Sequence, residues 1–413
     1  MGAVHRLLGI DAAVLDDRAF RVLLVASLVS PLGTAVVSPV LASLTGPFGV
    51  SEARAGLLLA VFTAPSILLI PAVGALSDRL GRRPVLAGGL ALFGLAGSAV
   101  ALTAEFTLVL GLRFVQGVGY CGIAPILITS VGDLYVGERE AAAQGVRFTV
   151  VGVALTVAPL VAGGLVVLAW QAPFLVYLLA LPAAAAVMRY LGEPRASNDT
   201  ERDDTDTASL WTVTRRPRVL LTLVGRTTPG LVWFAFLTYA STLVARLGGS
   251  PAVAGMVVAT ASLASALAAT QVGRVTAAVA RGRALAGGVA VCTAGLAGLP
   301  FAPSVVLTGV AAVAIGAGFG VSISLYRSEM TRLAPDARRG GLVSVGESVG
   351  RVGSTVAPVA TGALVAAAQP TLGNAGAARA ALLAVAVVAL LLGGASALLA
   401  PELPAPVDSP AAD

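Results

Sequence analysis

The chain has 413 residues, of which 57% are apolar and only 12% are charged. Soluble domains carry about 25% charged residues, so this composition excludes a soluble globular protein and indicates a membrane protein. The net charge of +6 comes from 27 arginines, without any lysine, against 21 acidic residues. The single histidine, His5, lies in the N-terminal tail, which argues against histidine-based catalysis or metal binding.

Twelve apolar segments are long enough to cross a bilayer as helices, which requires about 20 residues each. They are much longer than the strands of a membrane barrel, which have about 9–11 residues. The sequence therefore predicts an all-α integral membrane protein with twelve transmembrane helices. The spans lie near 20–44, 53–76, 84–103, 107–131, 142–166, 172–191, 219–243, 252–272, 284–302, 305–327, 341–366 and 378–399.

The arginines are distributed unevenly between the two sides that these spans define. With the N-terminus inside, 21 arginines lie in the inner segments or their flanks, three lie outside and three lie within spans. Because positive charge is retained on the cytoplasmic side, we expect a multi-pass protein of the cell membrane with both termini in the cytoplasm. The same distribution explains the basic net charge without nucleic acid as a partner.

The spans fall into two groups of six that resemble each other. An offset of 199 residues aligns TVAPLVAGGL (Thr156–Leu165) with TVAPVATGAL (Thr355–Leu364), and Gly117 with Gly316. Two parallel repeats are the architecture of many secondary transporters, which bind substrate between the halves.

A polar, acidic stretch, EPRASNDTERDDTDTAS, separates the two groups and is typical of a linker. The predicted parts are an N-terminal six-helix half (1–191), a cytoplasmic linker (192–218), a C-terminal six-helix half (219–400) and a disordered tail (401–413).

The loop after the second span reads GALSDRLGRRPVL, from Gly74 to Leu86. It resembles the signature of the major facilitator superfamily, G-x-L-a-D-r-x-G-r-[RK]-x-x-l, and lies between spans 2 and 3, as in that family. The resemblance covers the whole chain except its tails and linker, and it implies a transporter built from two pseudo-symmetric six-helix halves. In this loop Gly74 and Gly81 would permit close helix approach and a tight turn. The residues assigned to a cytoplasmic gate are Gly74, Asp78, Arg79, Gly81, Arg82, Arg83 and Asp133.

The charged residues of this loop are expected to hold helix ends together. Asp78 can accept hydrogen bonds from a helix N-terminus, and Arg82 and Arg83 can pair with carboxylates such as Asp133, which closes span 4. In the family, the residue matching Asp78 faces the start of span 11, and the one matching Arg82 pairs with an acid at the end of span 4. Alternatively, the arginines only fix the topology. The matching loop of the second half, GRVTAAVARGRAL, lacks the aspartate, so we expect a one-sided latch.

Span 4 carries RFVQGVGYCGIAP, from Arg113 to Pro125. It resembles a second signature of the family, R-x-x-q-G-x-g, whose arginine lies in the membrane and is associated with proton coupling. Arg113 lies roughly 9 Å into the span, at 1.5 Å per residue. An arginine at that depth is costly and marks a functional site. The alternative is that its head group extends to the outer interface.

Span 5 resembles the antiporter signature of the same superfamily, G-x8-G-x3-G-P-x2-G-G. Gly145, Pro159 and Gly163 match it, and alanine replaces glycine at three other positions. Small residues let helices pack closely and proline bends the span. The match favours export by antiport, with uptake or facilitated transport as the alternative.

Four charged residues are expected inside the membrane: Arg113, Arg226, Glu347 and Arg351. Glu347 can pair with Arg351 at i,i+4 or with Arg226 across helices. As the only carboxylate well inside a span it is the candidate proton carrier, and a permanent structural ion pair is the alternative. The polar face of span 11 that carries it should meet a cavity or another helix. The excess of arginine disfavours cationic drugs and keeps anionic or amphipathic substrates in consideration.

These features predict a secondary active transporter that moves a small amphipathic molecule by alternating access, with proton-coupled efflux of the multidrug-resistance type favoured. Its partners would be membrane lipid, the substrate and protons; the proton gradient would drive it without a cofactor or metal, and it would act as a monomer. An enzyme is not expected, because no cluster of nucleophile, base or metal ligands occurs. The alternatives are proton-coupled uptake or facilitated transport of a metabolite or organic anion, and a non-transporting membrane receptor.

Overall fold

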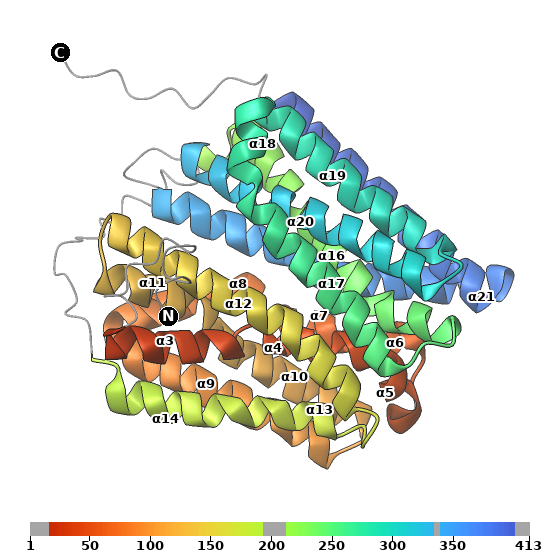
Figure 1. Ribbon diagram of the computed structural model, residues 1–413, viewed down its shortest axis with the longest axis horizontal. Coiled ribbons are helices and arrows are strands. Elements are labelled where there is room, and N and C mark those ends of the chain that lie inside the picture. The colour runs from red at the N-terminus through yellow and green to blue at the C-terminus, as the bar shows by residue number, and fades with distance from the viewer. Residues whose placement is uncertain (1–15, 193–211, 334–338, 401–413) are drawn as a thin grey trace, which may run out of the picture. The chain divides into compact units, whose positions relative to one another are not determined.

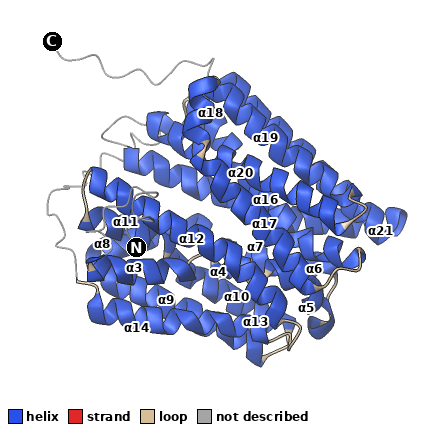
Figure 2. Ribbon diagram, in the orientation of Figure 1, coloured by secondary structure: helices blue, strands red, loops and turns tan. Residues whose placement is uncertain are grey.

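The computed structural model describes residues 16–192, 212–333 and 339–400 of the chain. The predicted tail, 401–413, and residues 193–211 of the predicted linker lie outside these ranges. Within the described ranges every regular element is a helix and no strand occurs (Figure 2). The prediction of an all-α protein is confirmed.

In the described part of the chain, eleven helical segments are long and apolar enough to cross a membrane. The last of them, Gly341–Leu399, has 59 residues. At 1.5 Å per residue it would measure roughly 90 Å, about three times the thickness of the hydrocarbon core. It is interrupted at Gly373, whose φ of 66° and ψ of 175° are not helical and favour glycine. The two predicted spans 341–366 and 378–399 lie on either side of this residue, so the segment provides two crossings.

The helices form two compact units, which we call unit 1 and unit 2. Unit 1 comprises Met1–Ser197 and Gly249–Ala259, and unit 2 comprises Asn198–Gly248 and Thr260–Asp413. Each unit contains its own close helix contacts, described separately below.

Unit 1 contains the helices of the first six predicted spans. They are α3 (Arg18–Val29), α4 (Leu32–Ala35), α5 (Leu41–Phe48), α6 (Glu52–Ala55), α7 (Leu57–Thr63), α8 (Pro65–Leu80), α9 (Arg82–Ala99), α10 (Phe106–Cys121), α11 (Ala124–Leu134), α12 (Glu138–Leu165), α13 (Ala172–Leu175) and α14 (Ala180–Tyr190). Within this unit α9 packs against both α10 and α14 (Figure 1). Aromatic rings join α7, α9 and α13: Phe62, Phe93, Tyr177 and Phe174 follow one another with centroids 5.4 to 6.4 Å apart. Such edge-on and tilted ring pairs are the favoured geometry of aromatic packing.

Unit 2 contains the remaining helices. They are α16 (Pro217–Arg246), α17 (Pro251–Thr270, of which the first part groups with unit 1), α18 (Val272–Ala278), α19 (Arg281–Gly298), α20 (Val305–Leu333) and α21 (Arg339–Leu399). Here α19 packs against α20 and α21 (Figure 1), and α16 packs along α21. Aliphatic side chains form the core, for example Leu285 and Val289 of α19 with Leu325 of α20.

Equivalent glycines in the two units make equivalent close contacts. A Cβ on Gly117 would lie within 3.0 Å of the carbonyl oxygen of Phe62, and one on Gly316 within 3.0 Å of the carbonyl oxygen of Ala261. Both members of the second pair lie 199 residues after those of the first, so the internal repeat predicted from the sequence is present in the packing. Small residues at such contacts allow backbones to approach closely in a membrane. A further pair with this relation is Gly119 and Gly318.

Candidate functional site

The signature loop joins α8 to α9 through Gly81, whose φ of 96° favours glycine. Arg82, the first residue of α9, donates from Nε to Asp133 at the end of α11 (3.0 Å). Its Nη1 atom donates to Asp78 and to Ser77 near the end of α8, each at 2.5 Å. The pair that the resemblance implies between Arg82 and the acid closing span 4 is therefore present, and one arginine joins the ends of three helices.

The other residues assigned to the gate have different environments. Arg83 donates to the carbonyl oxygen of Met188 rather than to a carboxylate. Because Met188 lies in the last turn of α14, this contact satisfies a carbonyl that the helix leaves unpaired and complements the helix dipole. Arg79 is exposed, and a Cβ on Gly74 would meet no atom within 4 Å. The expected close approach at Gly74 is thus not found.

Unit 2 contains an arginine–carboxylate pair at the position related to Arg82. Arg281, 199 residues after Arg82, donates from Nε to Glu329 at 2.9 Å. The expectation of a one-sided latch is therefore wrong for the arginine pair and holds only for the aspartate, since Ala277 occupies the position of Asp78. The offset missed Glu329 because the residue aligned with Asp133 is Arg332, one turn further along α20.

Arg113 lies in α10 and is fully buried within unit 1. Its acceptors are the carbonyl oxygens of Leu58 (3.1 Å) and Gly33 (2.6 Å), the amide oxygen of Gln116 and the hydroxyl oxygen of Tyr177 (3.3 Å). The guanidinium also lies 4.6 Å from the centroid of the Phe62 ring, in cation–π distance. The side chain reaches no interface, which excludes the alternative that it extends to the membrane surface.

In unit 2, Glu347 forms ion pairs with two arginines from two other helices. Arg226 of α16 contacts its Oε1 from Nη2 at 3.0 Å, and Arg327 of α20 contacts the same oxygen from Nε at 2.8 Å. Arg226, one of the two partners expected from the sequence, is thus bonded directly, and Arg351 also interacts electrostatically with Glu347. Arg327 was missed because it lies at the predicted end of span 10, where an arginine was taken to fix topology.

Glycines allow α16 and α21 to approach each other around this ion pair. A Cβ on Gly350 would lie within 3.0 Å of the Arg226 guanidinium, and a Cβ on Gly353 within 3.0 Å of the carbonyl oxygen of Thr227. The side chain of Arg226 is consequently only 5% exposed. The polar face of the predicted span 11 therefore meets another helix, one of the two environments expected for it.

Two of the three antiporter-type residues in α12 lie at a backbone contact within unit 1. A Cβ on Gly163 would lie within 3.0 Å of the carbonyl oxygen of Pro251, and a Cβ on Gly255 within 3.0 Å of that of Pro159. A Cβ on Gly145 would meet no atom within 4 Å, so this glycine has no comparable contact. The alanines that replace glycine in the signature, Ala154, Ala158 and Ala162, are all buried.

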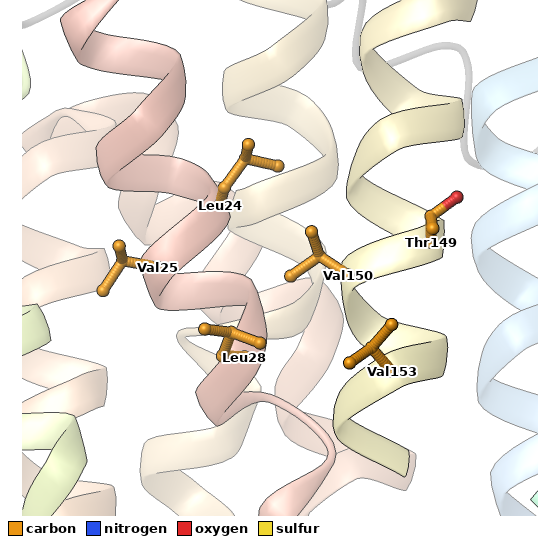
Figure 3. Close-up of a pocket in the computed structure, with 6 residues that line it drawn as sticks. All are labelled: Leu24, Val25, Leu28, Thr149, Val150 and Val153. Atoms are coloured by element: carbon orange, nitrogen blue, oxygen red, sulfur yellow. The ribbon is translucent and has the colours of Figure 1, made fainter. Parts of the chain in front are cut away.

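An apolar cavity of about 210 Å³ lies between α3 and α12 (Figure 3). Its lining residues are Leu24, Val25, Leu28, Thr149, Val150 and Val153. Because its walls are apolar, it suits a hydrocarbon or aromatic group rather than a charge. The described residues contain no group of three or more histidine, cysteine or acidic side chains placed to hold a metal ion.

The family follows from a comparison with known protein families. The family model described as Major Facilitator Superfamily matches residues 23–326. The chain belongs to this superfamily. The members of this superfamily are membrane transporters and not enzymes, which confirms the family and the non-enzymatic class that the sequence predicted.

Several curated proteins that resemble this chain are exporters or resistance proteins. The bacillibactin exporter of Bacillus subtilis (strain 168) is 33% identical over 29% of this chain and 31% of the relative. The multidrug transporter protein MdtP of the same organism is 29% identical over 35% of this chain and 26% of its own length. A chloramphenicol resistance protein of Pseudomonas aeruginosa is 38% identical over 30% of this chain and 30% of its own length. The matches thus span less than a third of the length of each of these relatives.

Solved structures of transporters share the fold of this chain over nearly its whole length. A bacterial homologue of the human lysosomal transporter Spinster, inward-facing and unoccupied, superposes with a TM-score of 0.80 at 16% identity, covering 93% of this chain and 96% of the other. A D-xylose–proton symporter superposes with a TM-score of 0.75 at 15% identity, and the superposition covers 91% of this chain and 96% of the symporter. At these identities the likeness establishes the fold and no substrate.

Proposed function

We propose that the chain is a secondary active transporter that exports small amphipathic molecules across the cell membrane in exchange for protons. It would work by alternating access, as a monomer, with both termini in the cytoplasm as the arginine distribution favours. The observation that carries the proposal is the packing of α12: Pro159 and Gly163 lie in backbone contact with the start of α17, so the small residues of the antiporter signature are required there. The relatives named as exporters support the same direction.

The substrate class is supported by the apolar pocket between α3 and α12, which is open, since Val25, Leu28 and Val153 of its lining are exposed. The cavity between α3 and α12 offers apolar walls, which favour the hydrophobic part of an amphipathic molecule.

Within the membrane we propose that Glu347 takes up the exchanged proton, since it is the carboxylate bonded to a buried arginine and is itself partly accessible. A permanent structural ion pair is the alternative that the experiment below separates from this role.

Transport and its direction can be measured in everted membrane vesicles that respiration acidifies inside, with a pH-sensitive dye. A panel of neutral, cationic and anionic amphipathic compounds is added to vesicles with and without the protein. Under the proposal, at least one compound dissipates the gradient only when the protein is present, because it enters as protons leave. A compound that deepens the acidification instead would indicate symport, and a panel without effect would contradict a proton-coupled transporter.

The role of Glu347 can be tested in the same vesicles. Glu347→Gln keeps an amide oxygen that can accept from Arg226 but cannot carry a proton, so we expect normal amounts of protein in the membrane without proton exchange. Glu138→Gln, which changes an exposed carboxylate at the start of α12, is the matched control. Unchanged exchange in Glu347→Gln would assign the ion pair a structural role.

A further inference from the structure

Three arginines from three helices of unit 1 lie at the C-terminal end of α14. Arg83 of α9 donates to the carbonyl oxygen of Met188, in the last turn of α14. The guanidinium carbon of Arg18, at the start of α3, lies 3.8 Å from the centroid of the Tyr190 ring, and that of Arg189 lies 5.3 Å from the same centroid. We call Arg18, Arg189 and Tyr190 the basic–aromatic cluster. Both α3 and α9 pack against α14 (Figure 1), which brings these side chains together.

The two guanidinium groups of the cluster are close enough to bind one anion. Because they lie 3.8 and 5.3 Å from one ring centroid, their carbon atoms are at most about 9 Å apart. Two positive charges at this distance repel each other, and an anion between them is attracted by both. A phosphate has several acceptor oxygen atoms and forms charge-assisted hydrogen bonds of about 2.8 Å, so it can bridge guanidinium groups at this separation.

The hydrogen-bond donors of both arginines are accessible. Arg18, Arg189 and Tyr190 are all exposed, and among the described residues neither guanidinium forms a hydrogen bond or an ion pair. The carboxylate next to Arg18, that of Asp17, accepts instead from the hydroxyl of Tyr135 at 2.8 Å. A guanidinium that lies over an aromatic ring is held by the cation–π interaction and can still donate from its edge.

The helix dipoles do not account for the cluster. A positive charge favours a helix C-terminus, and Arg83 already supplies one to α14 through its bond to Met188. Arg18 is the first residue of α3, and a positive charge is unfavourable at a helix N-terminus. Its position beside Tyr190 therefore has another reason than the stability of its own helix.

An exposed, mainly apolar stripe of the sixth predicted span leads to the cluster. Four exposed residues follow one another along it at helical spacing: Leu178, Pro182, Ala185 and Arg189. The stripe rises roughly 16 Å, at 1.5 Å per residue, which is about the hydrocarbon thickness of one leaflet. A surface that is apolar along one leaflet and ends in guanidinium groups has the same order of chemistry as a phospholipid.

We propose that the basic–aromatic cluster binds the phosphate of an anionic phospholipid whose acyl chains lie along this stripe. Basic groups near a membrane surface attract anionic lipids, and the apolar stripe favours a ligand with acyl chains over a free phosphate. In the orientation proposed above, the lipid belongs to the cytoplasmic leaflet. The binding itself depends neither on the direction of transport nor on proton exchange.

The proposal is tested by native mass spectrometry of the full-length protein, purified in detergent and freed of lipid, which resolves the protein with one lipid bound. Dioleoyl phosphatidylglycerol and dioleoyl phosphatidylcholine share their acyl chains and phosphate and differ in net charge. We expect the first phosphatidylglycerol to bind about tenfold more tightly, because two arginines attract it. Equal affinities would overturn the proposal. Displacement of the bound lipid by an equal concentration of inorganic phosphate would also overturn it, since the arginines would then bind a free anion.

Charge variants locate the site. Arg18→Gln and Arg189→Gln should each weaken phosphatidylglycerol binding about fivefold and leave phosphatidylcholine binding unchanged. The matched control is Arg332→Gln, which removes an exposed arginine from the end of α20 in unit 2 and should change neither. An equal loss in Arg332→Gln would mean attraction by net charge alone, and wild-type affinity in Arg18→Gln and Arg189→Gln would place the lipid elsewhere. Either result would overturn the proposal.

Variants of the ring distinguish an arranged pair of arginines from a count of charges. Tyr190→Leu keeps every charge but removes the ring, so it should weaken phosphatidylglycerol binding about threefold. Tyr190→Phe keeps the ring and should bind as the wild type does. Equal binding by the two variants would contradict the cluster as the binding site.

The predicted linker carries the competing anions of this chain, six acidic residues between positions 193 and 206. Their replacement by the corresponding amides should leave the preference for phosphatidylglycerol in place. A protein that binds this lipid only after the replacement would assign the arginines to the linker and overturn the proposal.

Discussion

Units 1 and 2 each bury an arginine in a helix, and the two arginines have different kinds of hydrogen-bond acceptors. Arg113 in unit 1 is surrounded by neutral oxygen atoms, two of which are backbone carbonyls, and by an aromatic ring. Arg226 in unit 2 has a carboxylate partner, Glu347, which it shares with Arg327. Both arginines are almost completely buried.

The difference determines which of the two contacts can be exchanged during a transport cycle. The carbonyl partners of Arg113 belong to the backbone of other helices, so they can separate from it only if the helices themselves move apart. A carboxylate on a side chain can change rotamer, accept a proton or give up one arginine for another. We therefore interpret Arg113 as a fixed brace of unit 1 and the Arg226–Glu347–Arg327 contact as the exchangeable element of unit 2.

The largest expected effect is the loss of the brace in unit 1. Arg113→Leu leaves buried acceptors without donors, each of which costs about 1–3 kcal/mol, so we expect a loss of about 3–5 kcal/mol in unfolding free energy. Arg113→Lys should restore little, since one ammonium group cannot reach acceptors in several directions. Thermal unfolding of the purified variants in detergent measures both effects. A stable Arg113→Leu variant would remove the distinction between the two arginines.

The second prediction concerns the carboxylate partner in unit 2. Glu347→Leu leaves Arg226 buried without a counter-ion, which costs about 3 kcal/mol in unfolding free energy. The double variant Arg226→Leu with Glu347→Leu should recover most of that loss, because apolar pairs often replace buried ion pairs without penalty.

The two buried arginines should also differ in whether a second substitution can restore stability. No side-chain replacement can remove the carbonyl acceptors of Arg113, so its loss should have no equivalent second-site rescue, whereas that of Glu347 should. Unfolding curves of the two single variants and the double variant give the coupling energy. A double variant as unstable as Glu347→Leu alone would contradict an exchangeable pair.

The third prediction concerns what the two units share. Gly117→Ala and Gly316→Ala each place a Cβ within 3.0 Å of a backbone carbonyl oxygen, so each should destabilise the protein by about 1–3 kcal/mol. Gly88→Ala and Gly287→Ala, related by the same offset of 199, are matched controls because a Cβ there meets no atom within 4 Å. Thermal unfolding should show equal losses in the first pair and none in the second. Unequal losses between Gly117 and Gly316 would show that the repeat no longer has the same packing role in both units.

Composition and periodicity were sufficient to predict the helical fold, the position of the spans and the repeat. A 20-residue apolar run has few alternatives in a membrane. The close contacts of Gly117 and Gly316 could also be anticipated, since the offset of 199 places them at equivalent positions. The break at Gly373 was foreseen only as a gap between two apolar runs.

The partners of the charged residues could be predicted only in part. Arg82 and Asp133 were identified because a family pattern fixes both. Glu329 was missed because the side chain that completes a pair can come from the next turn of a helix, which changes the alignment without changing the contact. Arg327 was missed because it lies at the predicted end of a span, where an arginine was taken to fix topology. The carbonyl acceptors of Arg113 are beyond sequence reasoning, because every residue has such an oxygen and only the packing shows which ones face the arginine.

The smallest expected effect distinguishes the two units at equivalent helix starts. Glu105 caps α10 by accepting from the backbone amides of Leu108 (2.6 Å) and Thr107 (2.9 Å). At the position 199 residues later, Ser304 caps α20 with a neutral hydroxyl that accepts from Leu307. The amide of Leu108, followed by that of Thr107, holds the pKa of Glu105 below its ordinary value of 4.5.

A pKa that is lower in the folded state means that the ionised form stabilises the fold at neutral pH and that this contribution is lost as the pH falls through the folded pKa. Glu105→Gln should therefore lower the melting temperature slightly at pH 7, and the difference from wild type should shrink as the pH falls below 4.5. Ser304→Ala should give a difference that does not change over the same range, because a hydroxyl does not titrate there. Melting temperatures between pH 7 and 3 in detergent test both variants. A pH-independent difference for Glu105→Gln would mean that the cap acts through its geometry alone, and the two units would then start these helices in the same way.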